Sequence, residues 1–148
     1  MAVQWLQASA PSSLLRRALL GNAAFSLLFA VVCLLDAPAL AAWTGIQPPF
    51  VFTVLGVLIL PFAVGMGWLA LRVADLRSAG RVILALDVAW VAVSVVLLLT
   101  GWLPLTDAGW WTVALVADVV ALFAVLEYLG LRRLSTAQGG TYAEPTRA

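Results

Sequence analysis

Residues 81–100, with the sequence RVILALDVAWVAVSVVLLLT, decide the fold class of this chain. After Arg81 the stretch is apolar except for Asp87, Ser94 and the terminal threonine. A helix of about 20 residues rising about 1.5 Å per residue crosses the ~30 Å hydrocarbon core of a bilayer. Backbone groups in hydrocarbon must find their hydrogen-bond partners within the segment itself. The stretch therefore predicts a transmembrane helix that carries one aspartate inside it.

Three more apolar runs have the same character, at residues 18–35, 50–71 and 108–131. Of the 148 residues, 64% are hydrophobic and 10% are charged, whereas soluble domains carry roughly 25% charged residues. We therefore predict an all-α fold, a transmembrane antiparallel four-helix bundle. The four spans are expected at about 16–36, 50–72, 81–102 and 108–131. They form a transmembrane domain over residues 14–134, between a polar leader at 1–13 and a flexible cytoplasmic tail at 135–148.

The basic residues predict the orientation of the spans. All eight are arginines, and they fall near both termini and around the connection between the second and third spans. The other two connections, 36–49 and 101–107, contain none. Because positively charged loops stay in the cytoplasm, we expect both termini and the middle connection there. Four tryptophans are expected at the opposite interface: Trp43, Trp102, Trp110 and Trp111.

Composition argues against several classes of function. The chain has no histidine and a single cysteine, Cys33, so we expect no metal or haem site and no internal disulfide. A net charge of +1 gives no basic patch for nucleic acid. The sequence also lacks the common motifs of nucleophilic, phosphate-binding and zinc-dependent enzymes. We therefore expect a non-enzymatic protein with no cofactor beyond a lipophilic ligand.

Three polar side chains inside the apolar runs are expected at one depth. Asn22, Asp87 and Glu127 each lie five or six residues inward from the nearest flanking arginine. At the rise of an α-helix this corresponds to roughly 8 to 9 Å inside the cytoplasmic boundary. Asp118 is deeper, at roughly 21 Å. Polar groups at such depths avoid lipid and face a bundle interior, a cavity or a partner.

Helical spacing indicates which faces carry these residues. On the third span Asp87, Trp90 and Ser94 fall on one stripe, and on the first span Asn22 and Ser26 do the same. We expect both stripes to face inward, where the Asn22 amide can donate to the Asp87 carboxyl. The same layer also fits a purely structural set of hydrogen bonds between helices. The candidates for a ligand site or polar layer are Asn22, Ser26, Asp87, Trp90, Ser94 and Glu127.

The fourth span carries two acids that cannot both face one bundle axis. Asp118 and Glu127 are nine residues apart, which places them on opposite sides of a helix. Either Glu127 lies inside and Asp118 faces another subunit, or Asp118 lies inside and Glu127 is peripheral. The second span has small residues at helical spacing, which is typical of close helix packing. The candidates for a partner interface are Asp118, Gly56, Ala63 and Gly67.

The runs RRALLGNAAFSLLFAVVCLL and LALDVAWVAVSVVLLL, a span beginning GWWTVALVADVVAL and the sequence YLGLRRL resemble a known class of protein. They look like the small four-span integral membrane proteins of high-GC bacteria. The resemblance implies a compact four-helix unit in the bacterial inner (cytoplasmic) membrane. It implies no activity and no site residue.

Three functions remain open at this point. The favoured one is an accessory or scaffolding subunit that packs against a partner membrane protein or a second copy of itself, as a homo-oligomer or in a larger membrane complex. The alternative is a carrier or sensor of a lipophilic small molecule, such as a quinone, pigment or lipid, in an intrabundle pocket. A proton-coupled transporter subunit is the second alternative.

Overall fold

The computed structural model describes residues 12–73 and 75–139, and this part of the chain is helical with no strands. It contains five helices: α1 (Ser12–Leu35), α2 (Ala37–Thr44), α3 (Phe50–Arg72), α4 (Arg77–Thr100) and α5 (Asp107–Gly139). The four helices other than α2 are long and apolar enough to cross a membrane. The predictions of an all-α fold and of four long apolar helices are therefore confirmed.

Two predicted boundaries are wrong. α4 begins at Arg77 and runs through Gly80, and α5 continues to Gly139, so residues 135–139 are helical where we expected a flexible tail. Gly80 lies at a close approach between helices, because a Cβ there would lie 3.3 Å from the side chains of Leu15 and Leu131. The rest of the predicted leader, 1–11, and of the predicted tail, 140–148, lies outside the described residues.

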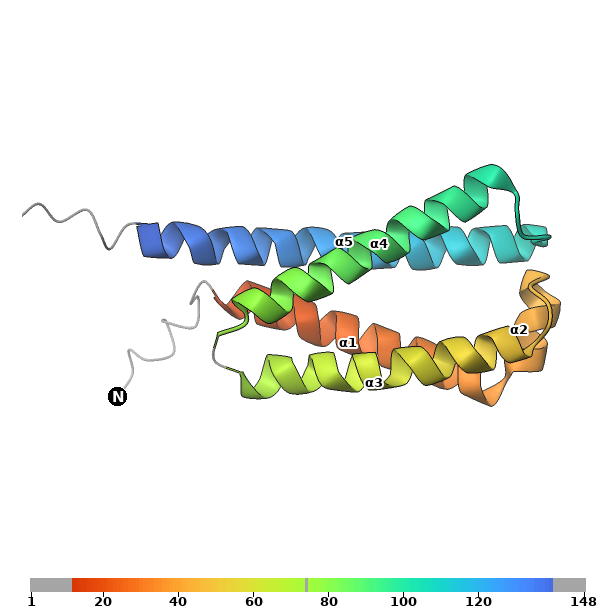
Figure 1. Ribbon diagram of the computed structural model, residues 1–148, viewed down its shortest axis with the longest axis horizontal. Coiled ribbons are helices and arrows are strands. Elements are labelled where there is room, and N and C mark those ends of the chain that lie inside the picture. The colour runs from red at the N-terminus through yellow and green to blue at the C-terminus, as the bar shows by residue number, and fades with distance from the viewer. Residues whose placement is uncertain (1–11, 74, 140–148) are drawn as a thin grey trace, which may run out of the picture.

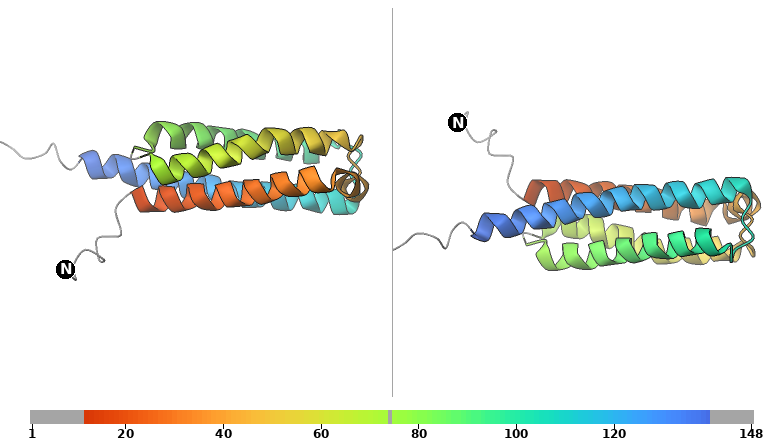
Figure 2. Two further views of the ribbon diagram at one scale, coloured as in Figure 1. Left: turned by 90° about the horizontal axis from the view of Figure 1, so that it is seen from below. Right: turned by 90° about the horizontal axis from the view of Figure 1, so that it is seen from above.

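The long helices lie side by side, and their packing leaves one side of the group open (Figures 1 and 2). α1 packs against α3 and α5, and α5 packs against α4, whereas the backbones of α3 and α4 do not approach closely and the two helices meet only through side chains, such as Met66 and Ile83. Figure 1 shows α4 leaning away from α3 towards the end that carries α2. The α3–α4 connection lies at the other end, together with the start of α1 and the end of α5.

The short helix α2 covers the end of the bundle where α5 begins. The carboxylate of Asp36 caps α2 by accepting from the Ala39 amide at 3.3 Å, and Gly45 ends it in the left-handed region with φ of 83°. The Trp43 indole Nε1 donates to Thr112 Oγ1 on α5 at 3.1 Å, and the Thr106 amide donates to the Thr44 carbonyl at 3.0 Å. These bonds fix α2 against the start of α5.

Two apolar clusters occupy the two ends of the bundle. One, near the α3–α4 connection, contains Leu15, Leu19, Met66 and Ile83 among its buried residues. The other lies under α2 and contains Cys33, Ala37, Ala41 and Phe52. On α1 the first cluster reaches Ala23 and the second begins at Phe29, and the polar side chains of Asn22 and Ser26 lie where the two clusters approach each other.

Two glycines in the long helices differ sharply in their surroundings, and this gives a test of the packing. A Cβ at Gly130 on α5 would lie 2.8 Å from the Leu15 Cα and 2.9 Å from its backbone nitrogen, whereas one at Gly65 on α3 meets nothing within 4 Å. We expect Gly130→Ala to lower the free energy of unfolding by about 1 to 3 kcal/mol through overpacking. Gly65→Ala is the control and should be neutral or stabilising, because alanine is favoured over glycine in helices.

Thermal unfolding in mild detergent, followed by circular dichroism, compares the two variants. Equal midpoints for Gly130→Ala and Gly65→Ala would contradict the close approach of α1 and α5.

Candidate functional site

One amide joins three helices inside the bundle. The Nδ2 of Asn22 on α1 donates to Asp87 Oδ2 on α4 at 2.6 Å and to Glu127 Oε1 on α5 at 3.0 Å. The three residues, called here the polar triad, are 1%, 5% and 0% exposed respectively. The structure therefore brings together the three side chains that were predicted to share one depth.

No described arginine donates a hydrogen bond to the two carboxyl groups of the polar triad. Both hydrogens of the Asn22 amide are used, one on each carboxyl, and Asn22 Oδ1 accepts from Ser26 Oγ at 3.3 Å. Glu127 Oε2 is buried without a partner among the described residues. A buried acceptor left unpaired costs roughly 1 to 3 kcal/mol. The site therefore keeps unused hydrogen-bonding capacity in its interior.

A cavity of about 280 Å³ lies beside the polar triad, and we call it the inner cavity. Its polar wall is formed by Asn22, Ser26 and Asp87. The remaining wall is apolar and comes from all four long helices: Phe25, Phe29, Leu55, Leu58, Ile59, Phe62, Leu86, Trp90, Val116 and Val120. A space of this size and composition approaches the lower end of the range for small-molecule pockets, ~300 to 1,000 Å³.

A second cavity of about 250 Å³, the outer cavity, extends towards α2. Phe29, Leu55, Trp90 and Val116 line both cavities, so the two are neighbours. Three hydroxyls line the outer cavity, and each donates to the backbone of its own helix: Thr44 to Leu40, Ser94 to Trp90 and Thr112 to Ala108. The hydrogens of these three hydroxyls are therefore already used, and the outer cavity presents an apolar surface to a ligand. Ser94, predicted as part of the polar layer, lies in it and does not join the polar triad.

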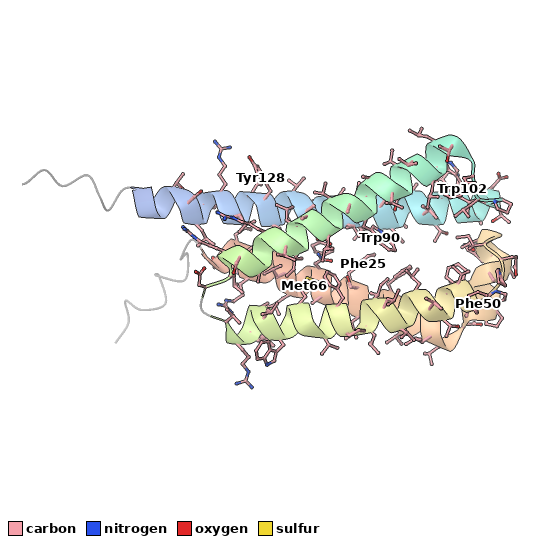
Figure 3. The ribbon with its side chains drawn as sticks, in the orientation of Figure 1. Phe25, Phe50, Met66, Trp90, Trp102 and Tyr128 are labelled. Atoms are coloured by element: carbon pink, nitrogen blue, oxygen red, sulfur yellow. The ribbon has the colours of Figure 1, made fainter. Side chains whose placement is uncertain are left out.

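Trp90 stands at the junction of the two cavities. Its ring lines both of them, and its indole Nε1 is buried with no hydrogen-bond partner in the described part of the chain. Figure 3 shows Trp90 and Phe25 between α4 and the pair formed by α1 and α3. Trp90 therefore offers a donor, and Glu127 an acceptor, that no other described side chain uses.

The structure distinguishes Asp118 and Glu127, the two acids within the apolar run of α5. Glu127 is fully buried in the polar triad, and Asp118 is exposed on the outer face of the helix. Of the two arrangements left open by the sequence, the structure has the one with Asp118 facing away from the bundle.

Of the three predicted partner-interface residues on α3, two are covered by the chain itself. Gly56 lies against α1, where a Cβ would come within 2.7 Å of Leu34 Cγ, and Gly67 faces Ala23 at 3.7 Å. Ala63 is 2% exposed. Gly56 and Ala63 are therefore buried within the chain and cannot meet a partner, whereas a partner contact at the half-buried Gly67 stays a prediction.

Sequence reasoning missed the contribution of α3 to the cavities. Leu55, Ile59 and Phe62 line the inner cavity, and their spacing of four and three residues places them on one helical face. That spacing was visible in the sequence, but an apolar stripe carries no polar residue that would distinguish a cavity wall from a lipid-facing surface.

Comparison with protein-family models, curated proteins and solved structures found no match. Among the described residues there is also no group of three or more side chains placed to hold a metal ion. The features of the described residues that bear on function are therefore the polar triad, the two cavities and the surface of the helices.

The shared amide gives a direct test of the polar triad. Asn22→Ala removes the donor of both carboxyl bonds, so we expect the free energy of unfolding in detergent to fall by about 1 to 3 kcal/mol. Ser26→Ala is the matched control, because it removes only the 3.3 Å bond at the edge of the site. Chemical denaturation followed by tryptophan fluorescence measures both. An equal, small loss in the two variants would show that Asn22 does not hold the helices together.

Proposed function

We propose that the four long helices cross the bacterial inner membrane as an antiparallel bundle, with both termini and the α3–α4 connection in the cytoplasm. The distribution of charge supports this orientation. Every described arginine lies at the end of the bundle where α1 begins and α5 ends: Arg16, Arg17, Arg72, Arg77, Arg81, Arg132 and Arg133. Of the five exposed tryptophans among the described residues, Trp68 lies near the arginines, and four lie at the other end: Trp43, Trp102, Trp110 and Trp111.

Within this bundle the inner cavity is the binding site of a lipophilic small molecule, so that the protein serves as a carrier or sensor. The observation that carries this proposal is the composition of the cavity, an apolar chamber with a single polar wall at Asn22, Ser26 and Asp87. Ligand pockets combine apolar walls with a few polar groups that fix orientation. A purely structural hydrogen-bond layer would need no chamber beside it.

The open side of the bundle supports lateral access from the bilayer. α3 and α4 both line the inner cavity, but their backbones do not approach closely. A lipophilic molecule dissolved in the membrane would reach the cavity between these helices without passing through water.

The unused polar atoms favour a ligand with a compact polar head. A carbonyl would accept from the indole of Trp90, and a hydroxyl would donate to the Asp87 carboxyl on the polar wall of the inner cavity. An apolar tail would then occupy the outer cavity. This chemistry fits a quinone or a similar ring with one or two oxygens on a hydrocarbon chain.

Proton-coupled transport has less support from the same geometry. A path for protons needs polar groups along its length. The three hydroxyls of the outer cavity are engaged with their own helices, and Asp118 lies on the opposite, exposed side of α5. The described polar groups therefore stop at the polar triad.

A second candidate function, an accessory subunit, is favoured by the outer face of α5. Asp118 is exposed there within a stripe of exposed apolar side chains: Trp111, Leu115, Leu122, Val125 and Leu129. These positions alternate spacings of four and three residues, the pattern of a helix that packs against another helix. Exposing a carboxyl group to lipid in the middle of a transmembrane helix costs free energy. A helix of a partner membrane protein, or of a second copy, would cover it.

The cavity proposal predicts that the purified protein retains a lipophile. Leu55 lines both cavities, so we expect Leu55→Trp to fill the space and to reduce the retained ligand at least ~10-fold, equivalent to about 1.4 kcal/mol of binding. Leu71→Trp is the matched control, because Leu71 is 66% exposed on the same helix. Native mass spectrometry from mild detergent, followed by solvent extraction, gives the bound mass and its amount per chain.

Two results would contradict the cavity proposal: a wild-type protein that carries only bulk phospholipid, or a Leu55→Trp variant that retains as much ligand as Leu71→Trp. The same spectra report on the second candidate. A complex present in the wild type and lost in Asp118→Leu, with the bound lipophile unchanged, would favour the accessory role for α5.

A further inference from the structure

Three arginines from two helices line one groove, separate from the cavities, at the end of the bundle that we place in the cytoplasm. Arg77 and Arg81 come from α4, and Arg132 comes from α5. Leu84 and Leu131 form the apolar part of the groove, which has a volume of about 400 Å³. None of the described side chains that line it is acidic. The positive charge of the groove therefore has no counter-charge among its own walls.

Helical spacing builds the groove from two facing stripes. Arg77, Arg81 and Leu84 recur at intervals of four and three residues along α4. Tyr128, Arg132 and Ser135 do the same along α5. Both stripes run along their helices, so the groove follows the seam between α4 and α5, which pack against each other.

The two helices are fastened together beside the groove. The guanidinium of Arg77 donates to the backbone carbonyl of Leu134, which bridges the start of α4 and the last turns of α5. Arg77 is half-buried, whereas Arg81 and Arg132 are exposed. Arg77 therefore positions the groove, and the other two arginines present their charge to the surroundings.

We propose that this groove binds the phosphate of an anionic phospholipid. Guanidinium groups pair with phosphate oxygens through two parallel hydrogen bonds, and basic pockets between transmembrane helices on the cytoplasmic side hold anionic headgroups. Arg81 lies six residues, or roughly 9 Å, outward from Asp87 of the polar triad, so the groove falls at the level of the headgroups.

The apolar part of the groove favours a phospholipid over a free phosphate ion as the ligand. Leu84 and Leu131 lie one turn or less inward of Arg81 and Arg132, on the side of the hydrocarbon. They would contact the first part of the acyl chains while the arginines hold the phosphate. A zwitterionic lipid is a poorer fit, because its headgroup also brings a cation to a groove lined by three arginines.

Lipid selection tests this site in the full-length protein. The protein is reconstituted in mixed micelles with equal amounts of phosphatidylglycerol and phosphatidylcholine, and native mass spectrometry gives the ratio of the two lipids bound. We expect the wild type to favour phosphatidylglycerol at least ~10-fold, and the double variant Arg81→Gln/Arg132→Gln to lose most of this preference.

The matched control is Arg72→Gln/Arg133→Gln. It removes the same charge from exposed positions at the same end of the bundle, but neither residue lines the groove. The control should keep the preference of the wild type. An equal loss in the two double variants would overturn the site and indicate general attraction between a basic surface and anionic lipid. A wild type without preference would overturn it without any variant.

Two further arms complete the test. Inorganic phosphate at millimolar concentration should leave the bound phosphatidylglycerol unchanged, and its displacement would assign the groove to free anions instead. Arg81→Lys/Arg132→Lys keeps the charge and guards against misfolding of the glutamine variant. We expect it to bind phosphatidylglycerol more weakly than the wild type, because lysine lacks the planar fork of arginine. Undiminished selection in a folded lysine variant would contradict recognition by the arginine forks.

Discussion

The whole arrangement depends on one side-chain amide, that of Asn22, whose two hydrogens are both used inside the bundle. Asn22 is the side chain through which α1, α4 and α5 share hydrogen bonds, and it uses both hydrogens on carboxyl oxygens. In hydrocarbon no solvent molecule can form hydrogen bonds with these carboxyl groups, so their hydrogen-bond partners must lie inside the bundle. This requirement fixes the rotation of three helices about their axes and places the polar wall of the inner cavity.

The same constraint explains why α3 is held differently from the other three long helices. α3 contributes no side chain to the polar triad and packs mainly on α1, where Gly56 and Ala63 let the backbones approach. Nothing comparable links it to α4. The bundle is therefore joined along three seams and open along the fourth, beside the inner cavity, while arginines at the start of α4 and the end of α5 line a separate groove.

Sequence reasoning succeeded where hydrocarbon imposes a simple rule. Apolar length gave the four long helices, and counting inward from the arginines gave the common depth of Asn22, Asp87 and Glu127. It failed at residues whose role depends on which helix packs next to them. Small residues on α3 mark a close approach but do not say whether the approaching helix belongs to the same chain. The start of α4 at Arg77 lies before the expected bound and includes Gly80, which packs against Leu15 and Leu131, and the sequence does not show these neighbours.

Side-specific labelling of single cysteines shows whether lipid surrounds the four long helices. In a Cys33→Ala background, single cysteines are placed in the α3–α4 connection at Asp75, at Gln47 and at Trp102, and intact vesicles are treated with a membrane-impermeant thiol reagent. Gln47→Cys and Trp102→Cys should react from one side of the membrane and Asp75→Cys only from the other. Labelling of all three from the same side would rule out helices that cross a bilayer in this order.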